Sequence, residues 1–272
     1  MDNGQALQRR IFRDNEFAVQ ISGDGIPFIL GHCLLGCMEA DNAIQLLNFE
    51  QLARCSQLIR FDARGHGESA GSDIPRDYCW AQQALDIWAI ADHYIPGKRV
   101  ILGGFSMGSA TALHAALLRR EQVAALVLVL PPTAWHSRPL QAKKYRRLAS
   151  MIGWIAGASK LLLKLTQLSP KGKSARRALA LAVSEHISRA QPGYLRAALQ
   201  GAAKSDLPNL GDLQRLDIPT AILTWTDDEA HPVSTGKTLE SVMPDVRVYQ
   251  VSSPDDVANW TDYIEDMLHT LN

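Results

Sequence analysis

The chain has 272 residues, of which 46% are hydrophobic and 21% charged, and its 28 Lys and Arg balance its 28 Asp and Glu. This length suits one large α/β core or two small domains, and the neutral balance gives no indication of nucleic-acid binding. Residues 1–10 are polar, and no run of about 18 uncharged apolar residues is present, so we expect neither a signal peptide nor an integral membrane segment. The four cysteines are too sparse for a disulfide framework, and we expect reduced thiols in a cytoplasmic protein.

Short apolar runs alternate with amphipathic runs along most of the chain. We predict strands at Phe17–Ser22, Phe28–Gly31, Leu58–Asp62, Arg99–Gly103, Ala124–Leu130, Thr220–Thr224 and Val246–Val251. We predict helices at Ala40–Cys55, Cys79–Tyr94, Ser109–Arg119, Ser234–Met243 and Pro254–Leu271. This alternation indicates an α/β fold with a mostly parallel, doubly wound sheet that helices cover on both faces. Ligands of such sheets bind at the carboxyl ends of the strands.

One internal segment, residues 131–215, differs from the rest in charge. It holds 15 Lys and Arg but 3 Asp and Glu, a net charge of +12, and the remainder of the chain carries −12. Its helical periodicity covers Lys143–Trp154, Ala175–Ile187 and Pro192–Ala203, with a break at Pro170–Lys173. We therefore expect a basic helical cap at 131–215, inserted into a core formed by 1–130 and 216–272. Its cations either form a solvated helix face or attract an anionic partner such as an acyl carrier, a coenzyme thioester or a lipid surface.

The segment from Gly104 to Gly108 reads G-x-S-x-G, with Ser106 at its centre. An apolar, β-branched run precedes it and an Ala/Leu-rich run follows it, which predicts a sharp turn between a buried strand and a helix. Small residues two positions before and after the serine allow strand and helix to approach closely. Such a turn exposes the hydroxyl group at a helix N-terminus, where developing negative charge is favoured, and this is how a weak nucleophile is presented for acyl chemistry.

Four segments together resemble the α/β-hydrolase superfamily, in its form with a serine nucleophile and a helical cap. In chain order they are Gly31–Gly36, Phe61–Ser69, the serine turn and Trp225–Val233. The resemblance covers nearly the whole chain. It implies a nucleophile at Ser106 and an acid at Asp228 that orients a histidine, although the adjacent Asp227 is an alternative acid.

The same resemblance implies an oxyanion hole formed by the backbone N–H groups of Leu34 and Met107. Cys33 stands where the family usually has glycine, so the loop carrying Leu34 can differ in shape. We expect His32 to brace this loop rather than to act in catalysis. In the glycine-rich turn after the predicted strand at 58–62, we expect Asp62, Arg64 and His66 to be structural as well.

The family usually carries its catalytic histidine after the final strand, but the stretch Val251–Trp260 contains none. His269 lies near the end of the last predicted helix, with the spacing of a helix-surface residue. Three alternatives remain for the general base. His231 follows Asp228 by three residues at the active-site edge; His136 could reach the site from the cap; or the chain has lost triad hydrolysis.

These observations favour a serine hydrolase that acts, through an acyl-enzyme, on a small and largely apolar ester, lactone or thioester, with an anionic or carrier-linked acyl group as one option. Two alternatives stay open. The chain could be a degenerate binding protein, or a lyase, oxygenase or perhydrolase on the same scaffold. No nucleotide fingerprint, metal-ligand cluster or flavin motif is visible, so we expect neither a cofactor nor a metal ion. The sequence leaves a monomer and a homodimer open.

Overall fold

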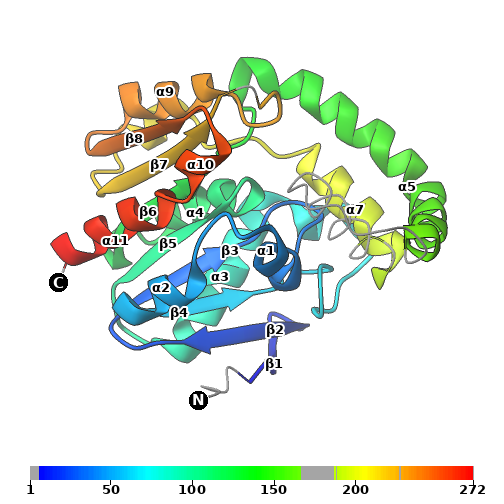
Figure 1. Ribbon diagram of the computed structural model, residues 1–272, viewed down its shortest axis with the longest axis horizontal. Coiled ribbons are helices and arrows are strands. Elements are labelled where there is room, and N and C mark those ends of the chain that lie inside the picture. Colours follow the sequence, from blue (N-terminus) through cyan, green and yellow to red (C-terminus); the bar gives the residue numbers. More distant parts are fainter. Residues whose placement is uncertain (1–5, 167–186, 188, 227, 272) are drawn as a thin grey trace.

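The computed structural model describes residues 6–166, 187, 189–226 and 228–271. Its centre is an eight-stranded sheet with the order β1-β2-β4-β3-β5-β6-β7-β8 (Figure 1). The strands are β1 Gln8–Phe12, β2 Asn15–Ser22, β3 Ile26–Gly31, β4 Ser56–Phe61, β5 Val100–Phe105, β6 Val123–Val129, β7 Thr220–Trp225 and β8 Val246–Val251. The strand β2 pairs antiparallel with β1 and β4, and the six strands from β4 to β8 in the sheet are parallel. The expected mostly parallel sheet is therefore confirmed.

Helices cover both faces of this sheet (Figure 1). On one face, α3 (Trp80–Tyr94), α4 (Met107–Leu118) and α9 (Val233–Val242) contribute to one buried apolar cluster with the sheet. On the other face, α2 (Phe49–Cys55) and α11 (Trp260–Thr270) contribute to a second cluster. Because apolar side chains of the central strands point into both clusters, strands such as β5 and β6 read as continuous apolar runs.

The predicted single helix over Ala40–Cys55 is wrong, because two helices occupy this stretch. The helix α1 (Met38–Ile44) ends at Gln45, whose backbone is left-handed with φ of 56°. The helix α2 then begins after Asn48, whose side chain accepts a hydrogen bond from the Gln51 N–H. This side-chain cap is a local signal for a helix start that the apolar periodicity concealed. The predicted terminal helix is likewise divided into α10 (Pro254–Val257) and α11.

The strand β1 was not expected from the sequence. Its residues are mostly exposed, so the alternation of buried and exposed positions is absent. It forms a hairpin with β2 through Arg13 and Asp14, which both have positive φ (49° and 58°). Such backbone angles are typical of tight hairpin turns, but asparagine and glycine are the usual residues there. The sequence thus lacked both common indications of this hairpin.

Between β6 and β7 the chain leaves the sheet and forms η3 (Trp135–Ser137), α5 (Arg138–Thr166), α7 (Pro192–Ala202) and α8 (Leu210–Leu213). The helices α5 and α7 pack on each other, and α7 also packs on η1 (Pro75–Tyr78). The predicted helices at Lys143–Trp154 and Pro192–Ala203 correspond to α5 and α7. The one expected at Ala175–Ile187 lies, apart from Ile187, outside the described residues, as does the break at Pro170–Lys173.

Candidate active site

Ser106 lies between the end of β5 and the start of α4, as the G-x-S-x-G pattern predicts. Its backbone has φ of 51° and ψ of −101°, a conformation that is costly for a residue with a side chain. The Ser106 N–H donates to the Val129 carbonyl at 2.9 Å, and the nearby Ser109 hydroxyl donates to the Gly104 and Val129 carbonyls. These hydrogen bonds hold the strained turn in place at the carboxyl edge of the parallel strands.

Three glycines make this turn possible by close backbone contact. A Cβ atom on Gly104 would lie 2.5 Å from the Gly31 carbonyl oxygen, and one on Gly108 would lie 2.4 Å from the same atom. No real side chain tolerates such distances, so β3, β5 and the first turn of α4 can meet at this point only without side chains. The predicted role of small residues on both sides of Ser106 is therefore confirmed by the geometry.

Ser106, His231 and Asp228 form one chain of hydrogen bonds. The Nδ1 atom of His231 lies 2.7 Å from Oδ2 of Asp228, and its Nε2 atom lies 2.8 Å from Oγ of Ser106. An ionised carboxylate only accepts hydrogen bonds, so Nδ1 carries the ring proton. Nε2 is then an acceptor, and the Ser106 hydroxyl donates to it. This is the protonation pattern that a general base for the serine needs.

Asp228 and His231 lie on one short loop between β7 and α9. Oδ1 of Asp228 accepts hydrogen bonds from the N–H groups of Ala230 and His231, at 2.9 and 3.2 Å. Burial alone would raise the pKa of Asp228, but the hydrogen bond and charge of His231 and these two N–H groups outweigh it. The pKa of Asp228 consequently lies below its ordinary value, and the carboxylate is ionised at neutral pH.

Two contacts tie this loop to the chain between β6 and β7. The Thr133 N–H donates to the Ala230 carbonyl at 3.1 Å. The Lys144 ammonium group on α5 lies 3.8 Å from a carboxylate oxygen of Glu229, although both side chains are well exposed. The backbone bond holds the loop carrying Asp228 and His231, while an exposed ion pair of this kind contributes little.

The other candidate histidines lie elsewhere. His136 is exposed on η3, and His269 is exposed on α11, where its ring nitrogen is 3.9 Å from Glu265. Asp227, the alternative acid, lies outside the described residues. Of the two histidines left open as a base, His231 and His136, the fold brings only His231 within hydrogen-bond distance of Ser106 in the described part of the chain.

The loop after β3 is braced by His32, which is almost fully buried. The Ala63 N–H donates to Nε2 of His32, so the ring proton is on Nδ1 and is donated to the Cys33 carbonyl at 2.8 Å. That carbonyl also accepts the Gly36 N–H. Since a trans peptide directs its C=O and N–H groups to opposite sides, these bonds turn the Leu34 N–H away from His32.

Met107, the second expected oxyanion donor, is the first residue of α4. The N–H groups in the first turn of a helix have no partner within that helix, and this one directly follows the serine. Cys33 directly precedes Leu34, the first expected oxyanion donor. Burial raises the pKa of the Cys33 thiol to about 12, so this cysteine is not a competing nucleophile at neutral pH.

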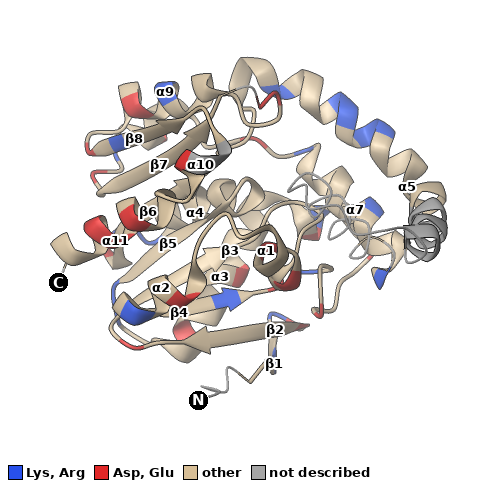
Figure 2. Ribbon diagram, viewed as in Figure 1, with Lys and Arg blue, Asp and Glu red and all other residues tan. Residues whose placement is uncertain are grey.

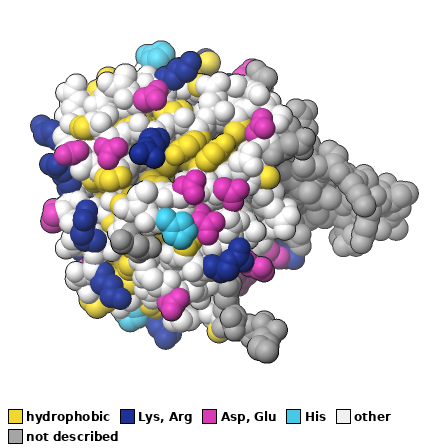
Figure 3. Space-filling model, turned by 60° about the vertical axis from the view of Figure 1, so that its left-hand side comes forward, with side chains coloured by type: hydrophobic (Ala, Val, Ile, Leu, Met, Phe, Trp, Pro, Cys, Tyr) yellow, Lys and Arg dark blue, Asp and Glu magenta, His cyan; other side chains and the backbone are white. Residues whose placement is uncertain are grey.

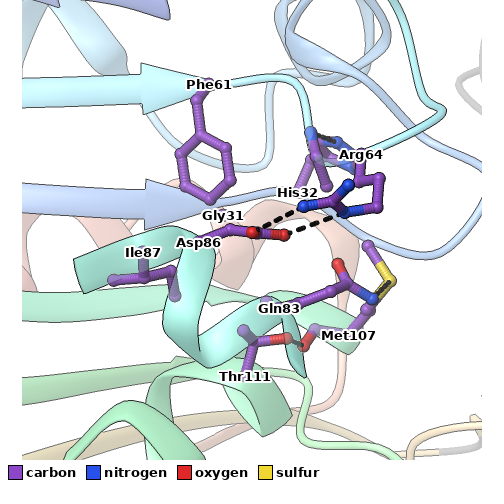
Figure 4. Close-up of a pocket in the computed structure, with 11 residues that line it drawn as sticks. Gly31, His32, Phe61, Arg64, Gln83, Asp86, Ile87, Met107 and Thr111 are labelled. Carbon is purple, nitrogen blue, oxygen red and sulfur yellow. Dashed lines mark hydrogen bonds and ion pairs between the residues drawn. The ribbon is translucent and has the colours of Figure 1, made fainter. Parts of the chain in front are cut away.

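A small cavity lies behind the first turn of α4, and sequence reasoning missed two of its polar residues, Asp86 and Gln83 (Figure 4). Asp86 on α3 pairs with Arg64 at 2.8 and 3.3 Å and with Arg13 at 2.7 Å. Gln83 donates to the Tyr78 carbonyl at 3.0 Å and approaches the Met107 sulfur at 3.6 Å. An isolated acid on the apolar face of a helix was the available signal for Asp86. Burial raises its pKa, although both arginines oppose this shift.

Among the described residues, no group of three or more His, Cys, Asp and Glu is arranged to hold a metal ion. No helix in the described part of the chain is both long and apolar enough to cross a membrane.

The profile of the alpha/beta hydrolase fold matches residues 26–263. The chain belongs to this family. It is similar to the "Putative carbamate hydrolase RutD" of Klebsiella pneumoniae (strain 342), with 27% identity over 195 residues, which are 69% of this chain and 70% of that protein. It is also 31% identical over 129 residues to the human mitochondrial palmitoyl-protein thioesterase ABHD10, covering 44% of this chain and 39% of that one.

Among solved structures, a thermophilic esterase from Thermogutta terrifontis superimposes with a TM-score of 0.77 at 22% identity, covering 97% of this chain and 99% of the other. At this identity the likeness shows the fold alone. Together with the family match and the hydrolase names of the relatives, it supports an alpha/beta hydrolase enzyme.

Proposed function

We propose that this alpha/beta hydrolase is a serine hydrolase that cleaves a small, largely apolar ester, lactone or thioester. The observation that carries the proposal is the hydrogen-bonded chain from Ser106 through His231 to Asp228, with distances of 2.8 and 2.7 Å. Its unusual feature is that the proposed base, His231, lies on the same loop as the proposed acid, Asp228. In this proposal His231 takes the role of the histidine that the family usually carries after its final strand. The relatives named for carbamate and thioester hydrolysis support a carbonyl substrate with a heteroatom leaving group.

In this mechanism Ser106 Oγ attacks the carbonyl carbon while its proton passes to Nε2 of His231. Asp228 holds the imidazole in the required tautomer and stabilises the imidazolium that forms. The N–H groups of Leu34 and Met107 stabilise the oxyanion. The intermediate collapses to an acyl-serine, and His231 protonates the departing alcohol or thiol. Water, deprotonated by His231, then releases the carboxylic acid and restores the serine.

Apolar side chains around the loop after β3 support the apolar substrate class. Leu34 and Leu35 pack against a buried cluster of α5 and α7 that includes Ile152, Leu195 and Leu199. We further propose that residues 131–215 act as a cap over the site, which would exclude water and select apolar acyl groups.

The first experiment is intact-mass analysis of the whole protein after treatment with a fluorophosphonate. One adduct on the wild type and none on Ser106→Ala is expected. Turnover of a panel of short and medium nitrophenyl esters and thioesters should be lost in the same variant. Hydrolysis that persists unchanged in folded Ser106→Ala protein would overturn the proposal, and so would a folded wild type that neither reacts nor turns over any ester.

A further inference from the structure

The helix α5 carries an exposed face on which large apolar and cationic side chains are mixed. This outer face of α5 consists of Leu140, Lys143, Lys144, Arg147, Met151 and Trp154. At about 100° per residue these six positions fall within an arc of about 100°, and they extend along about 21 Å of helix. The buried residues Ala142, Ala149 and Ile152 lie on the opposite side, against the rest of the molecule.

Three large apolar members of this face are exposed to solvent. The exposed fraction is 74% for Trp154, 66% for Leu140 and 41% for Met151. Five other large apolar side chains of the described structure are exposed: Leu7 and Ile11 at β1, and Ile74, Leu118 and Leu210 in three separate segments. Single exposed apolar residues need no explanation, but three on one face of one helix do.

The charge of this helix has one sign. The sequence of α5 contains seven Lys and Arg and no Asp or Glu. In the coloured part of this helix, Figure 2 shows blue and no red. Among the described residues, Lys144 is the one cation of the outer face within 4 Å of a carboxylate, that of Glu229. By contrast, the face shown in Figure 3 mixes both signs of charge around its hydrophobic side chains.

We propose that the outer face of α5 binds the surface of an anionic lipid membrane, with the helix lying parallel to it. Lys143 and Arg147 meet the lipid phosphates, and Leu140, Met151 and Trp154 enter the boundary between headgroups and acyl chains. Tryptophan is the side chain that favours this boundary most, because its ring is apolar and its N–H is polar. Cations of one sign spread among apolar side chains along one helix face match the layered chemistry of such a membrane, in which phosphates lie above acyl chains.

Binding of the whole protein to vesicles tests this proposal. Vesicles of phosphatidylcholine with 30% phosphatidylglycerol should retain the protein in a flotation assay at low salt, and pure phosphatidylcholine should retain far less. High salt should weaken retention, because it screens the cations. Brominated lipid should quench part of the tryptophan fluorescence of the wild type, and this quenching should be lost in Trp154→Phe.

Variants with matched controls locate the surface. The double variant Lys143→Glu/Arg147→Glu should lower the partition coefficient at least about 25-fold, since each cation near such a membrane contributes about fivefold. Its control, Lys98→Glu/Arg120→Glu, makes the same change in net charge at exposed positions elsewhere and should change the coefficient less than twofold. Trp154→Ser should weaken binding, whereas Leu118→Ser, at another exposed apolar residue, should not.

Retention lost only in the α5 variants supports the proposal. Equal losses in the α5 and control double variants would overturn it, because binding would then follow net charge alone. Failure of the wild type to bind anionic vesicles would also overturn it, and retention on an immobilised acidic acyl carrier protein in that case would indicate a protein partner. None of these readouts depends on enzymatic activity, so the proposed hydrolase function can fail or hold separately.

Discussion

At the scale of single residues, the notable feature is that Asp228 and His231 are three positions apart. The side chain of Asp228 bonds the backbone of the loop through one oxygen and the His231 ring through the other. One carboxylate therefore shapes the loop and orients the base. A tight loop of this kind places the imidazole beside Ser106, and the Val251 carbonyl at the end of β8 accepts a hydrogen bond from the Thr226 N–H at the start of the loop.

His231→Ala should lower kcat/KM at least about 10³-fold, because the serine then has no group to accept its proton. His136→Ala, which removes the other histidine considered for this role, should leave kcat/KM within about twofold. Ester hydrolysis by both variants, with folding checked by circular dichroism, measures this. Comparable losses in the two variants would contradict the assignment of the base.

His32 provides a prediction about pH. Burial lowers its pKa to about 4, against the effect of its bond to the Cys33 carbonyl. Between pH 6.5 and 4 the unfolded chain therefore binds a proton that the folded protein does not. This contribution to the free energy of unfolding is complete above pH 6.5 and is lost as the pH falls to 4, by about 3 kcal/mol.

Asp41 acts in the opposite sense, because burial raises its pKa to about 7 and the folded state then binds the additional proton. The two contributions to the free energy of unfolding oppose each other over the same pH range, so the pH dependence of total stability does not reveal the His32 contribution. The measurement is an NMR titration of the His32 ring, assigned with His32→Gln. Its resonances should stay unchanged from pH 8 to about pH 5, and a midpoint near 6.5 would contradict the prediction.

At the scale of elements, the effect of a Gly→Ala substitution on the free energy of unfolding depends on how closely strands and helices pack at that position. In Gly108→Ala the new Cβ meets the Gly31 carbonyl, and we expect a loss of about 2–3 kcal/mol in the free energy of unfolding. Gly153 lies on α5, where a Cβ would meet nothing within 4 Å. Gly153→Ala should stabilise by about 0.5–1 kcal/mol through helix propensity. Urea unfolding of both variants measures the difference, and equal effects would contradict it.

Two aspartates of α3 form a second matched pair. Asp86 is 2% exposed and pairs with Arg64, whereas Asp92 is exposed and pairs with Arg119 at 2.6 Å. Asp86→Ala leaves a buried guanidinium group without its carboxylate and should cost about 3–5 kcal/mol. Asp92→Ala should cost less than about 1 kcal/mol. Thermal and urea unfolding compare them, and a small loss for Asp86→Ala would show that the buried pair is dispensable.

At the scale of the whole molecule, the chain between β6 and β7 is joined to the core by buried contacts. The guanidinium of Arg138, at the start of α5, lies 4.2 Å from the centre of the Trp80 ring on α3, and the backbone N–H of Trp80 donates to the Ser205 hydroxyl at 3.1 Å. Leu34 packs against the cluster of α5 and α7. These contacts couple the two parts of the fold energetically.

We therefore expect the described parts of α5 and α7 to unfold together with the sheet in one transition. Tryptophan fluorescence and far-ultraviolet circular dichroism should give coincident curves in urea. Hydrogen exchange would reveal the opposite result. If residues 138–155 and 192–202 exchanged with a much lower opening free energy than β5 and β6, this segment would unfold by itself, and the prediction would be contradicted.

Much of this architecture follows from local patterns in the sequence. Apolar runs bounded by turns predicted most strands of the sheet and the helices α3, α4 and α9, because parallel strands buried on both faces carry a strong signal. The G-x-S-x-G run predicted the turn at Ser106, since its glycines meet a backbone requirement that is itself local. Prediction failed at the break between α1 and α2, where apolar periodicity concealed the Asn48 cap, and at β1, where an unusual hairpin turn replaces the common signals.

The tertiary structure alone decided which groups meet across the fold. Spacing placed His231 near Asp228, but His136 and the loss of triad hydrolysis stayed open as alternatives until the loop was positioned beside Ser106, 125 residues away in sequence. The pair of Asp86 with Arg64 and the exposure of Trp154 were likewise invisible in the chain. Hydrogen bonds and burial depend on distances in space that a sequence does not encode locally, whereas propensity and turn chemistry act between neighbours. For that reason the sequence determined the elements and the turn at Ser106, and the fold determined the contact between His231 and Ser106, the buried charges and the exposed face of α5.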